Sequence, residues 1–227
     1  DSILFIFYQL KKHTFVYMTK TNNSNLSNGV ELPLMEAFLT VQGEGYFAGQ
    51  PSYFLRIGGC DVGCHWCDVK ESWDPNLHPL TKVDDIIKAI RKNSVKIVVI
   101  TGGEPLMWNL DYLCQQLKSM NIQIHLETSG AYPLSGFFDW ICLSPKKTQL
   151  PLDYIQKIAN ELKIIVSNNN DLKWALLQQQ NINDKCKLYL QPEWSKKEII
   201  LPKIIDFVKL HSEWIISLQT HKYMNIP

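Results

Sequence analysis

The sequence has no excess of charge of either sign, because 23 lysines and arginines are balanced by 22 acidic residues. Such a balance offers no electrostatic footprint for nucleic acid or for an anionic membrane. No apolar run approaches the ~20 residues that a membrane-spanning helix needs. Six cysteines in 227 residues are too few and too unevenly spaced for a disulfide framework. These absences predict a cytoplasmic protein with reduced thiols and without a nucleic-acid or membrane partner.

The length and the 45% of apolar residues suit one domain, which we place at residues 31–227. The first thirty residues differ from the rest. An apolar run at 3–8 precedes two lysines, whereas a secretory signal carries its positive charge before the apolar region. Residues 19–28 are rich in Asn, Ser and Thr. We interpret 1–17 as an extraneous extension and 18–30 as a flexible lead, with an N-terminal strand as the alternative.

Strands and helices alternate along the rest of the chain. Apolar residues recur at helical spacing in some segments, as at Val83, Ile86, Ile87 and Ile90, and form short runs in others. The pattern predicts strands at 54–57, 96–100, 122–126, 140–143, 160–166, 187–191 and 214–219, and helices at 83–92, 110–120, 172–180 and 199–210. This alternation is typical of an α/β fold with a mainly parallel sheet, which gathers ligands at the carboxyl ends of its strands.

Three cysteines, Cys60, Cys64 and Cys67, lie within eight residues at the spacing C-x3-C-x2-C. Thiolates this close predict one shared centre of a soft metal. A structural zinc site is closed by four ligands, and His65 or a distant histidine would complete one here. A 4Fe–4S cluster also needs four ligands, so three thiolates leave one iron open to bind and cleave a further molecule. Isolated packing roles are assigned instead to the remaining cysteines, Cys114, Cys142 and Cys186.

The cysteine spacing resembles that of the radical S-adenosylmethionine (SAM) enzymes, and further segments resemble one family among them, the 7-carboxy-7-deazaguanine synthases. These segments lie at 38–45, 54–56, 101–105, 127–130, 144–146, 190–192 and 219–227. The resemblance implies a partial, modified (β/α)6 TIM-like barrel of the radical SAM type, open on one side. It also implies a lyase in which a reduced 4Fe–4S cluster cleaves SAM to a 5′-deoxyadenosyl radical. The radical converts 6-carboxy-5,6,7,8-tetrahydropterin to 7-carboxy-7-deazaguanine with loss of ammonia, on the way to queuosine and related 7-deazapurines.

The same resemblance implies the residues of the site. Cys60, Cys64 and Cys67 would ligate the cluster, and no catalytic side chain is implied beyond the cluster and SAM. The residues implied to hold SAM are Trp66, Cys67, Asp68, Gly103, Ser144, Pro145, Lys146, Gln191, Pro192, Glu193 and Trp194. Those implied to hold the pterin are Val41, Gln42, Gly43, Arg56, Thr101 and Pro227, joined by Glu44 and His221, while Glu127 would lie near the cofactor. The segment 192–194 departs from the small polar residues of the family, which leaves its side-chain roles open.

One further residue departs from the family pattern. The family carries a threonine after the Cys-Asp pair, and its hydroxyl binds a magnesium ion that bridges to the substrate carboxylate. This chain has Val69 there, and a valine offers no oxygen to a hard cation. Magnesium would then be absent, held by other groups, or replaced by a nearby cation such as Lys70.

The resemblance also implies an electron donor such as flavodoxin or ferredoxin, and a homodimer. Two other functions stay open on the sequence. One is an activase of a glycyl radical enzyme, which would need a surface for a protein partner and has no reason to carry the Gln-Gly-Glu-Gly run at 42–45. The other is a zinc-binding interaction module without enzymatic activity, which iron and sulfide analysis of the anaerobically purified protein would separate from a cluster protein.

Overall fold

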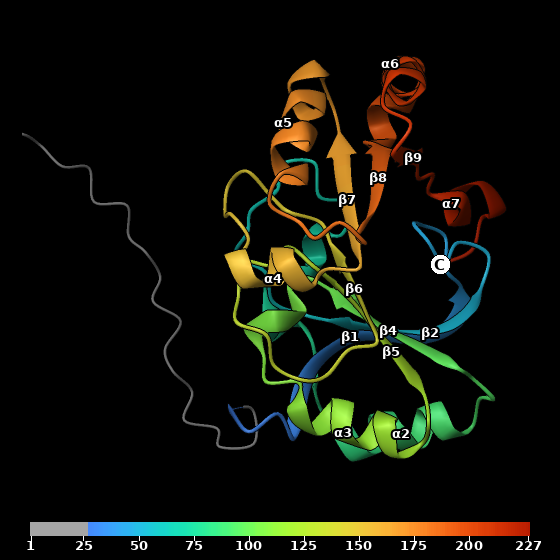
Figure 1. Ribbon diagram of the computed structural model, residues 1–227. Coiled ribbons are helices and arrows are strands. Elements are labelled where there is room, and N and C mark those ends of the chain that lie inside the picture. The colour runs from blue at the N-terminus through green and yellow to red at the C-terminus, as the bar shows by residue number, and fades with distance from the viewer. Residues whose placement is uncertain (1–26) are drawn as a thin grey trace, which may run out of the picture.

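The computed structural model describes residues 27–227, so the extension predicted at 1–17, and the lead up to residue 26, lie outside the described residues (Figure 1). The described strands are β1 (Glu31–Val41), β2 (Pro51–Ile57), β3 (Leu80–Lys82), β4 (Ile97–Gly102), β5 (Gln123–Thr128), β6 (Trp140–Leu143), β7 (Glu161–Val166), β8 (Lys187–Pro192) and β9 (Trp214–Ile216). The α-helices are α2 (Val83–Arg91), α3 (Asp111–Ser119), α4 (Asp153–Ile158), α5 (Asn169–Gln179), α6 (Lys197–Leu210) and α7 (Thr220–Met224). None of the helices in this part of the chain is long and apolar enough to cross a membrane.

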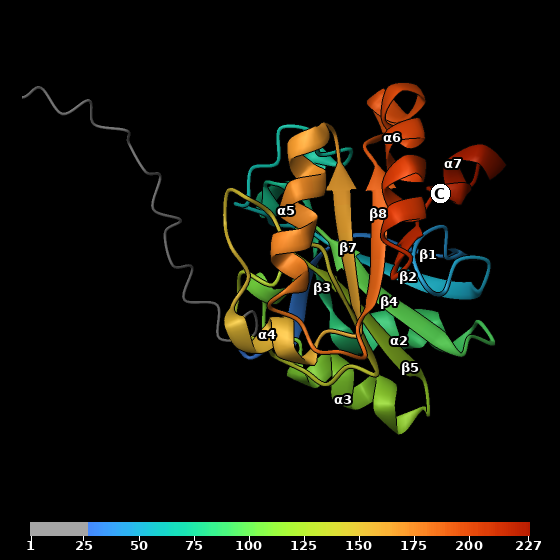
Figure 2. The same ribbon diagram turned by 45° about the horizontal axis from the view of Figure 1, so that its top comes forward.

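The strands form one sheet in the order β3-β1-β2-β4-β5-β6-β7-β8-β9. Every neighbouring pair from β2 to β9 is parallel, and only β1 runs antiparallel to its neighbours β2 and β3. Among the described strands no pairing joins the two ends of this order. The sheet curves about a hollow side that the α-helices leave uncovered, and the C-terminus lies at its opening beside β1 and β2 (Figures 1 and 2). The sheet is therefore an open, barrel-like arrangement.

The strands and helices predicted from the apolar pattern are all present, with shifted ends. The last predicted strand, 214–219, is shorter, because β9 ends at Ile216 and its pairing with β8 covers only residues 214–216. The pattern missed β1, where Pro33 and a bulge between Leu34 and Glu36 interrupt the alternation. It also missed the three-residue β3 and the helices α4 and α7, which are only 6 and 5 residues long. Elements this short carry little periodic signal.

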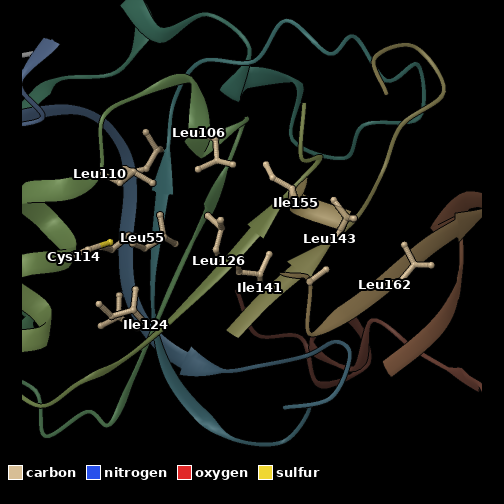
Figure 3. Packing of buried hydrophobic residues seen from close by; sticks show 14 of the residues in the cluster. Leu55, Leu106, Leu110, Cys114, Ile124, Leu126, Ile141, Leu143, Ile155 and Leu162 are labelled. Carbon is tan, nitrogen blue, oxygen red and sulfur yellow. The ribbon is translucent and has the colours of Figure 1, made fainter. Parts of the chain in front are cut away.

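The two faces of the sheet bury different residues, because successive side chains of a strand point to opposite sides. The outer face packs against the helices through a large apolar cluster that includes Leu55, Leu126, Leu143 and Leu162 (Figure 3). The hollow face has a much smaller apolar cluster of Phe54, Ile97 and Val99, with Phe38 and Phe47 against it. The stability of the sheet thus rests on its outer face, which leaves the inner face free for polar side chains.

Candidate functional site

A cavity of about 260 Å³ lies at the carboxyl ends of the strands on the hollow side of the sheet. It collects almost every residue that the sequence predicted. The predicted residues that line it are Val41, Gln42, Gly43, Glu44, Arg56, Cys60, Cys64, Trp66, Cys67, Asp68, Val69, Thr101, Gly103, Glu127, Ser144, Lys146, Gln191, Pro192, Glu193, Trp194, His221 and Pro227. Pro145 is buried but does not line the cavity, because neighbouring residues of an extended segment point to opposite sides.

The cysteine loop leaves β2 through a pair of glycines. Gly59 adopts φ +103°, and a Cβ there would lie 3.0 Å from the Trp108 ring. The indole Nε1 of Trp108 donates a hydrogen bond of 2.8 Å to the Gly58 carbonyl, and the Cys67 amide donates one of 3.0 Å to the Cys64 carbonyl. These local bonds turn the loop so that its three cysteines share one wall of the cavity.

All three cysteine thiols of this wall are free and half-buried. Burial raises the pKa of Cys60 to about 11. Burial also raises the pKa of Cys64, although the nearby Lys146 charge opposes it. Soft metals bind the thiolate, so a metal centre here would displace protons from these groups.

The wall fits an iron–sulfur cluster better than a zinc ion. Within residues 27–227 no three His, Cys, Asp or Glu side chains converge as a single ion requires. A four-iron cluster places each thiolate on a different iron, so its ligands stand farther apart. His65, the candidate fourth ligand of zinc, is exposed and does not line the cavity. Three thiols facing an open cavity also leave room for a molecule on a fourth iron.

The turn after β4 packs directly on the cysteine loop. Gly102 adopts φ +127°, and a Cβ there would lie 2.3 Å from the Ile57 carbonyl oxygen. A Cβ on Gly103 would meet the Gly59 carbonyl oxygen at the same distance of 2.3 Å. The amide of Glu104 donates to that carbonyl at 2.8 Å. Glycine is therefore required at both positions to bring the two backbones together.

Ser144 and Lys146 form the wall next to the cysteines. The Lys146 ammonium donates to the Ser144 carbonyl and, at 2.7 Å, to its hydroxyl. It also lies 5.6 Å from the ring centroid of Trp66. Burial lowers the pKa of Lys146, against the opposing effect of Cys64. A buried cation beside an aromatic ring suits an anionic group of a ligand, such as a carboxylate.

The end of β8 contributes the next part of the wall. The side-chain carbonyl of Gln191 accepts a hydrogen bond of 2.8 Å from the Ser217 hydroxyl. The Glu193 carboxylate is occupied by the amide and hydroxyl of Ser195, at 2.9 and 2.7 Å. The Trp194 ring lies under the Lys197 ammonium at 4.2 Å. Glu193 is thus engaged in a local turn, and the Trp194 ring is the larger surface that this segment offers to a ligand.

The wall opposite the cysteines is a buried polar network centred on Lys163. Its ammonium lies 2.5 Å from Glu44 Oε2 and 3.4 Å from Glu127 Oε2. Gln42 donates to Glu127 at 3.0 Å, and Gln219 donates to Glu44 at 2.9 Å. Burial alone would raise the pKa of Glu44, but the Lys163 charge and the hydrogen bonds from Lys163 and Gln219 outweigh it and lower the pKa to about 2. The Glu44 carboxylate is therefore charged at neutral pH.

Arg56 lies between the two walls, on β2. Its Nε is 3.0 Å from Glu36 Oε2, but the N–H does not point at the carboxylate and finds no hydrogen-bond partner. The guanidinium also lies 5.5 Å from the ring centroid of Phe38. A buried donor without an acceptor is costly, so Arg56 is poised to bind an acceptor group in the cavity.

The C-terminal segment forms part of the cavity wall through Gln219, His221 and Pro227. The Thr220 amide donates a hydrogen bond of 2.9 Å to the Gly43 carbonyl. The terminal Pro227 carbonyl accepts a hydrogen bond of 3.2 Å from the Thr40 hydroxyl. His221 packs against Gly43, where a Cβ would lie 2.2 Å from the His221 Nδ1 atom. Gly43, the first glycine of the Gln-Gly-Glu-Gly run, thus leaves space for the His221 side chain at the cavity.

Comparison with known proteins gives the family. Residues 55–141 match the Radical SAM superfamily. The chain is 54% identical over 210 residues to the 7-carboxy-7-deazaguanine synthase of Flavobacterium psychrophilum, covering 92% of this chain and 100% of the relative. The chain belongs to the 7-carboxy-7-deazaguanine synthase family. A second relative of that name, from Escherichia coli K12, is 32% identical over 224 residues, covering 87% of this chain and all of the relative. The crystal structure of QueE from Escherichia coli matches with a TM-score of 0.74 at 28% identity, covering 88% of this chain and 99% of that chain.

Membership of this synthase family confirms the predicted fold, a partial TIM-like barrel of the radical SAM type. It also confirms that the chain is an enzyme with a 4Fe–4S cluster and SAM as its cofactors. The activase and the zinc module are not favoured, because the relatives over most of the chain carry the synthase name.

At the position where the resemblance places the magnesium threonine of the synthases, the apolar side chain of Val69 lines the cavity. It offers no ligand to magnesium. Lys70, the predicted replacement, lies 6.0 Å from the ring centroid of Trp73 and does not line the cavity. Asp68 accepts from the Lys222 ammonium at 2.8 Å. The cations that do line the cavity are Arg56, Lys146 and Lys163.

Sequence reasoning missed two charged residues of the cavity. Glu104 is 1% exposed, and its carboxylate accepts hydrogen bonds from Leu106, Thr128 and Ser129. It joins the turn after β4 to the end of β5. Lys163 is 3% exposed in the middle of β7. The signal for Lys163 was present, because Glu161 and Lys163 alternate with apolar residues in a strand that is otherwise buried on both sides.

Proposed function

We propose that this chain converts 6-carboxy-5,6,7,8-tetrahydropterin to 7-carboxy-7-deazaguanine with loss of ammonia, a step toward queuosine and related 7-deazapurines. One observation carries the proposal: a single cavity joins three free thiols on one wall to a network of partly buried carboxylates on the other and places between them an arginine N–H that has no hydrogen-bond partner. The first wall suits a cluster and SAM, and the second suits a small polar heterocycle.

In this proposal Cys60, Cys64 and Cys67 would hold the 4Fe–4S cluster, and the open side of the cluster would be left to SAM. When bound, the cluster and SAM supply the one-electron chemistry that removes a hydrogen atom from the substrate. Gly103 lets the backbone approach the amino acid part of SAM, and Lys146 meets its carboxylate. Ser144 orients Lys146 by accepting its hydrogen bond. The remaining SAM contacts are assigned to Trp66, Cys67, Asp68, Gln191, Pro192, Glu193 and Trp194.

The substrate is assigned to the opposite wall. A pterin presents adjacent N–H groups on its aminopyrimidinone ring, and carboxylates such as Glu44 and Glu127 accept from such an edge. Glu127, which the resemblance placed near the cofactor, is assigned to the substrate here because it shares Lys163 with Glu44. Arg56 carries the unpaired N–H, which suits the oxygen of a carboxylate or a ring carbonyl. The backbone of Val41, Gln42 and Gly43, the side chains of Thr101 and His221, and Pro227 complete the pocket. The C-terminal segment, which lines the cavity, reduces the access of water to the bound substrate.

Three finer assignments belong to the same proposal. A small redox protein such as flavodoxin or ferredoxin supplies the electron, and the chain works as a homodimer in the cytoplasm. Magnesium has a minor role, because Val69 removes the expected ligand and three protein cations already line the cavity.

The test is anaerobic turnover of the reconstituted protein with SAM, dithionite and the carboxypterin, with the deazaguanine product measured by mass spectrometry. The cluster requires about four irons and four sulfides per chain. Cleavage of SAM without the deazaguanine would point to a different substrate for the same radical chemistry. Full iron and sulfide content without cleavage of SAM would overturn the proposal.

A further inference from the structure

Lys163 is a buried charge that no part of the proposed chemistry uses. It lies on the inner face of β7, is 3% exposed, and reaches the cavity wall with its ammonium. Burial alone would lower the pKa of Lys163, but the surrounding acidic groups hold it well above its ordinary value. Lys163 is therefore a fixed positive charge in an interior where an unpaired charge is expensive.

The two partners of Lys163 come from different parts of the fold. Glu44 lies on the loop that follows β1, whereas Glu127 lies at the end of β5. One ammonium thus holds two carboxylates that no backbone pairing brings together. Each carboxylate has one further donor on its other oxygen, Gln219 on Glu44 and Gln42 on Glu127.

The third acidic group that faces Lys163 is already satisfied elsewhere. Glu161 accepts from the Tyr46 amide at 3.2 Å and from the Trp140 indole at 3.1 Å. A Cβ on Gly45 would lie 2.0 Å from Glu161 Oε1, so the glycine lets this loop rest against Glu161. Glu161 therefore fixes the backbone of the loop, while Lys163 fixes the carboxylate that the loop carries.

One ammonium between two carboxylates leaves a net negative charge at the cavity wall. A ligand edge with adjacent N–H donors complements that charge, whereas an edge with a carbonyl oxygen in place of an amino group is repelled by it. We propose that Lys163 is a positioning residue for substrate selection, which holds Glu44 and Glu127 at the spacing needed to accept from the amino-bearing edge of the substrate ring. This inference rests on the proposed function, because it takes the substrate to be the carboxypterin.

The experiment compares the carboxypterin with its analogue that carries an oxo group in place of the 2-amino group, the corresponding tetrahydrolumazine. Each is turned over by the reconstituted full chain, and kcat/KM is measured for the parent, Lys163→Met, Lys163→Arg and the control Lys187→Met. Lys187 is exposed at the start of β8 and outside the cavity. The SAM affinity of every variant is measured in parallel.

We expect Lys163→Met to reduce the preference for the amino compound at least about tenfold, with unchanged affinity for SAM. Lys163→Arg should restore part of the preference, and Lys187→Met should keep all of it. Lys163→Met leaves two partly buried carboxylates without a cation. The double variant that combines Lys163→Met with Glu44→Gln removes one of these carboxylates, so the comparison stays available if the single variant does not fold. That double variant should also lose the preference.

Two results would overturn the inference. The first is a preference for the amino compound that stays at the parent value in Lys163→Met or in the double variant, despite lower activity. That result would show that Lys163 only supports the fold. A parent protein that makes no deazaguanine would overturn the proposed function and this inference together, whereas a productive parent with an unaltered preference in the variants overturns the inference alone.

Discussion

The two walls of the cavity are built in different ways. The cysteine wall is almost a single segment: its three thiols lie within one loop, held by glycine turns and by backbone bonds from the neighbouring turn after β4. The carboxylate wall is assembled from β5, β7, the loop after β1 and the C-terminal segment. Asp68 links the two, because it accepts from Gln219 and Lys222. The difference shows that the three candidate cluster ligands are specified locally, whereas the carboxylate wall exists only in the folded chain.

The sharpest test of this difference is Cys64→Ala. We expect complete loss of the cluster colour and of SAM cleavage. The two remaining thiolates cannot hold a stable four-iron cluster, so no iron is left to bind SAM. The local origin of this wall predicts that the apo variant unfolds at the same temperature as the apo parent. Absorption spectra, 5′-deoxyadenosine formation and thermal unfolding measure the three quantities.

Cys114→Ala, Cys142→Ala and Cys186→Ala provide the matched controls, since these buried thiols lie outside the cavity. They should keep the cluster. A Cys64→Ala protein with full activity would remove the basis of the cluster assignment.

The next largest effect is expected from Arg56→Ala, a change between the two walls that we assign to the substrate. Loss of the guanidinium should lower turnover of the carboxypterin by about a hundredfold or more, because it removes the cationic partner of a buried ligand group. The affinity for SAM, measured by equilibrium dialysis, should stay unchanged. If substrate affinity survives while SAM affinity falls, Arg56 belongs to the cofactor side and the division between the walls is wrong.

Val69→Thr is expected to have a smaller effect, limited to the response to magnesium. After treatment with a chelator, the parent should recover little activity on addition of magnesium, whereas the variant should recover several-fold more, because the new hydroxyl supplies an oxygen ligand. Activity titrated against magnesium in both proteins checks this. An equally strict requirement in the parent would show that other oxygens hold the ion.

The smallest effect concerns stability rather than activity. The pKa of Glu44 is lowered from 4.5 to about 2, so the folded chain binds this proton less readily than the unfolded chain. The ion pair therefore stabilises the fold above pH 4.5, and this contribution, on the order of 3 kcal/mol, is lost as the pH falls from 4.5 toward 2. Urea unfolding at several pH values measures the loss. The double variant that combines Lys163→Met with Glu44→Gln should lack this component, and an unchanged acid profile in that variant would contradict the assignment.

The contrast between the walls also explains what could be read from the sequence. The spacing of Cys60, Cys64 and Cys67 is enough to predict a shared metal centre. The residues at strand ends could be placed at the site because parallel strands end at one edge of a sheet. The alternation of Glu161 and Lys163 with apolar residues marks Lys163 as a polar position of β7, but its partners could not be found from the sequence, because Glu44 and Glu127 lie far away in the chain. Its role depends on the curvature of the sheet, which brings β7 and the loop after β1 together.

The same reasoning applies to the elements that were missed. The pattern of β1 is interrupted at Pro33 and at the bulge that follows, although its pairing with β2 and β3 makes it part of the sheet. Pro145 was assigned to the cavity with its neighbours Ser144 and Lys146, but the alternation of an extended segment turns it away. In both cases tertiary structure decides what the local sequence leaves open.

The loop after β1 and the segment after β9 meet without any pairing of strands, which has a consequence for how the cavity opens. The contacts between these two segments come from side chains and single amides, such as Gly45 N to Ser217 Oγ at 3.0 Å and Thr220 N to Gly43 O at 2.9 Å, and not from a ladder of strands. Local unfolding is easiest where few cooperative bonds must break together. This seam can therefore detach as a small unit while the parallel strands stay paired, which gives a planar product a way out without loss of the core. Amide exchange of residues 43–45 and 217–221 should accordingly be faster than that of β4 and β5, and should slow when the cavity is filled.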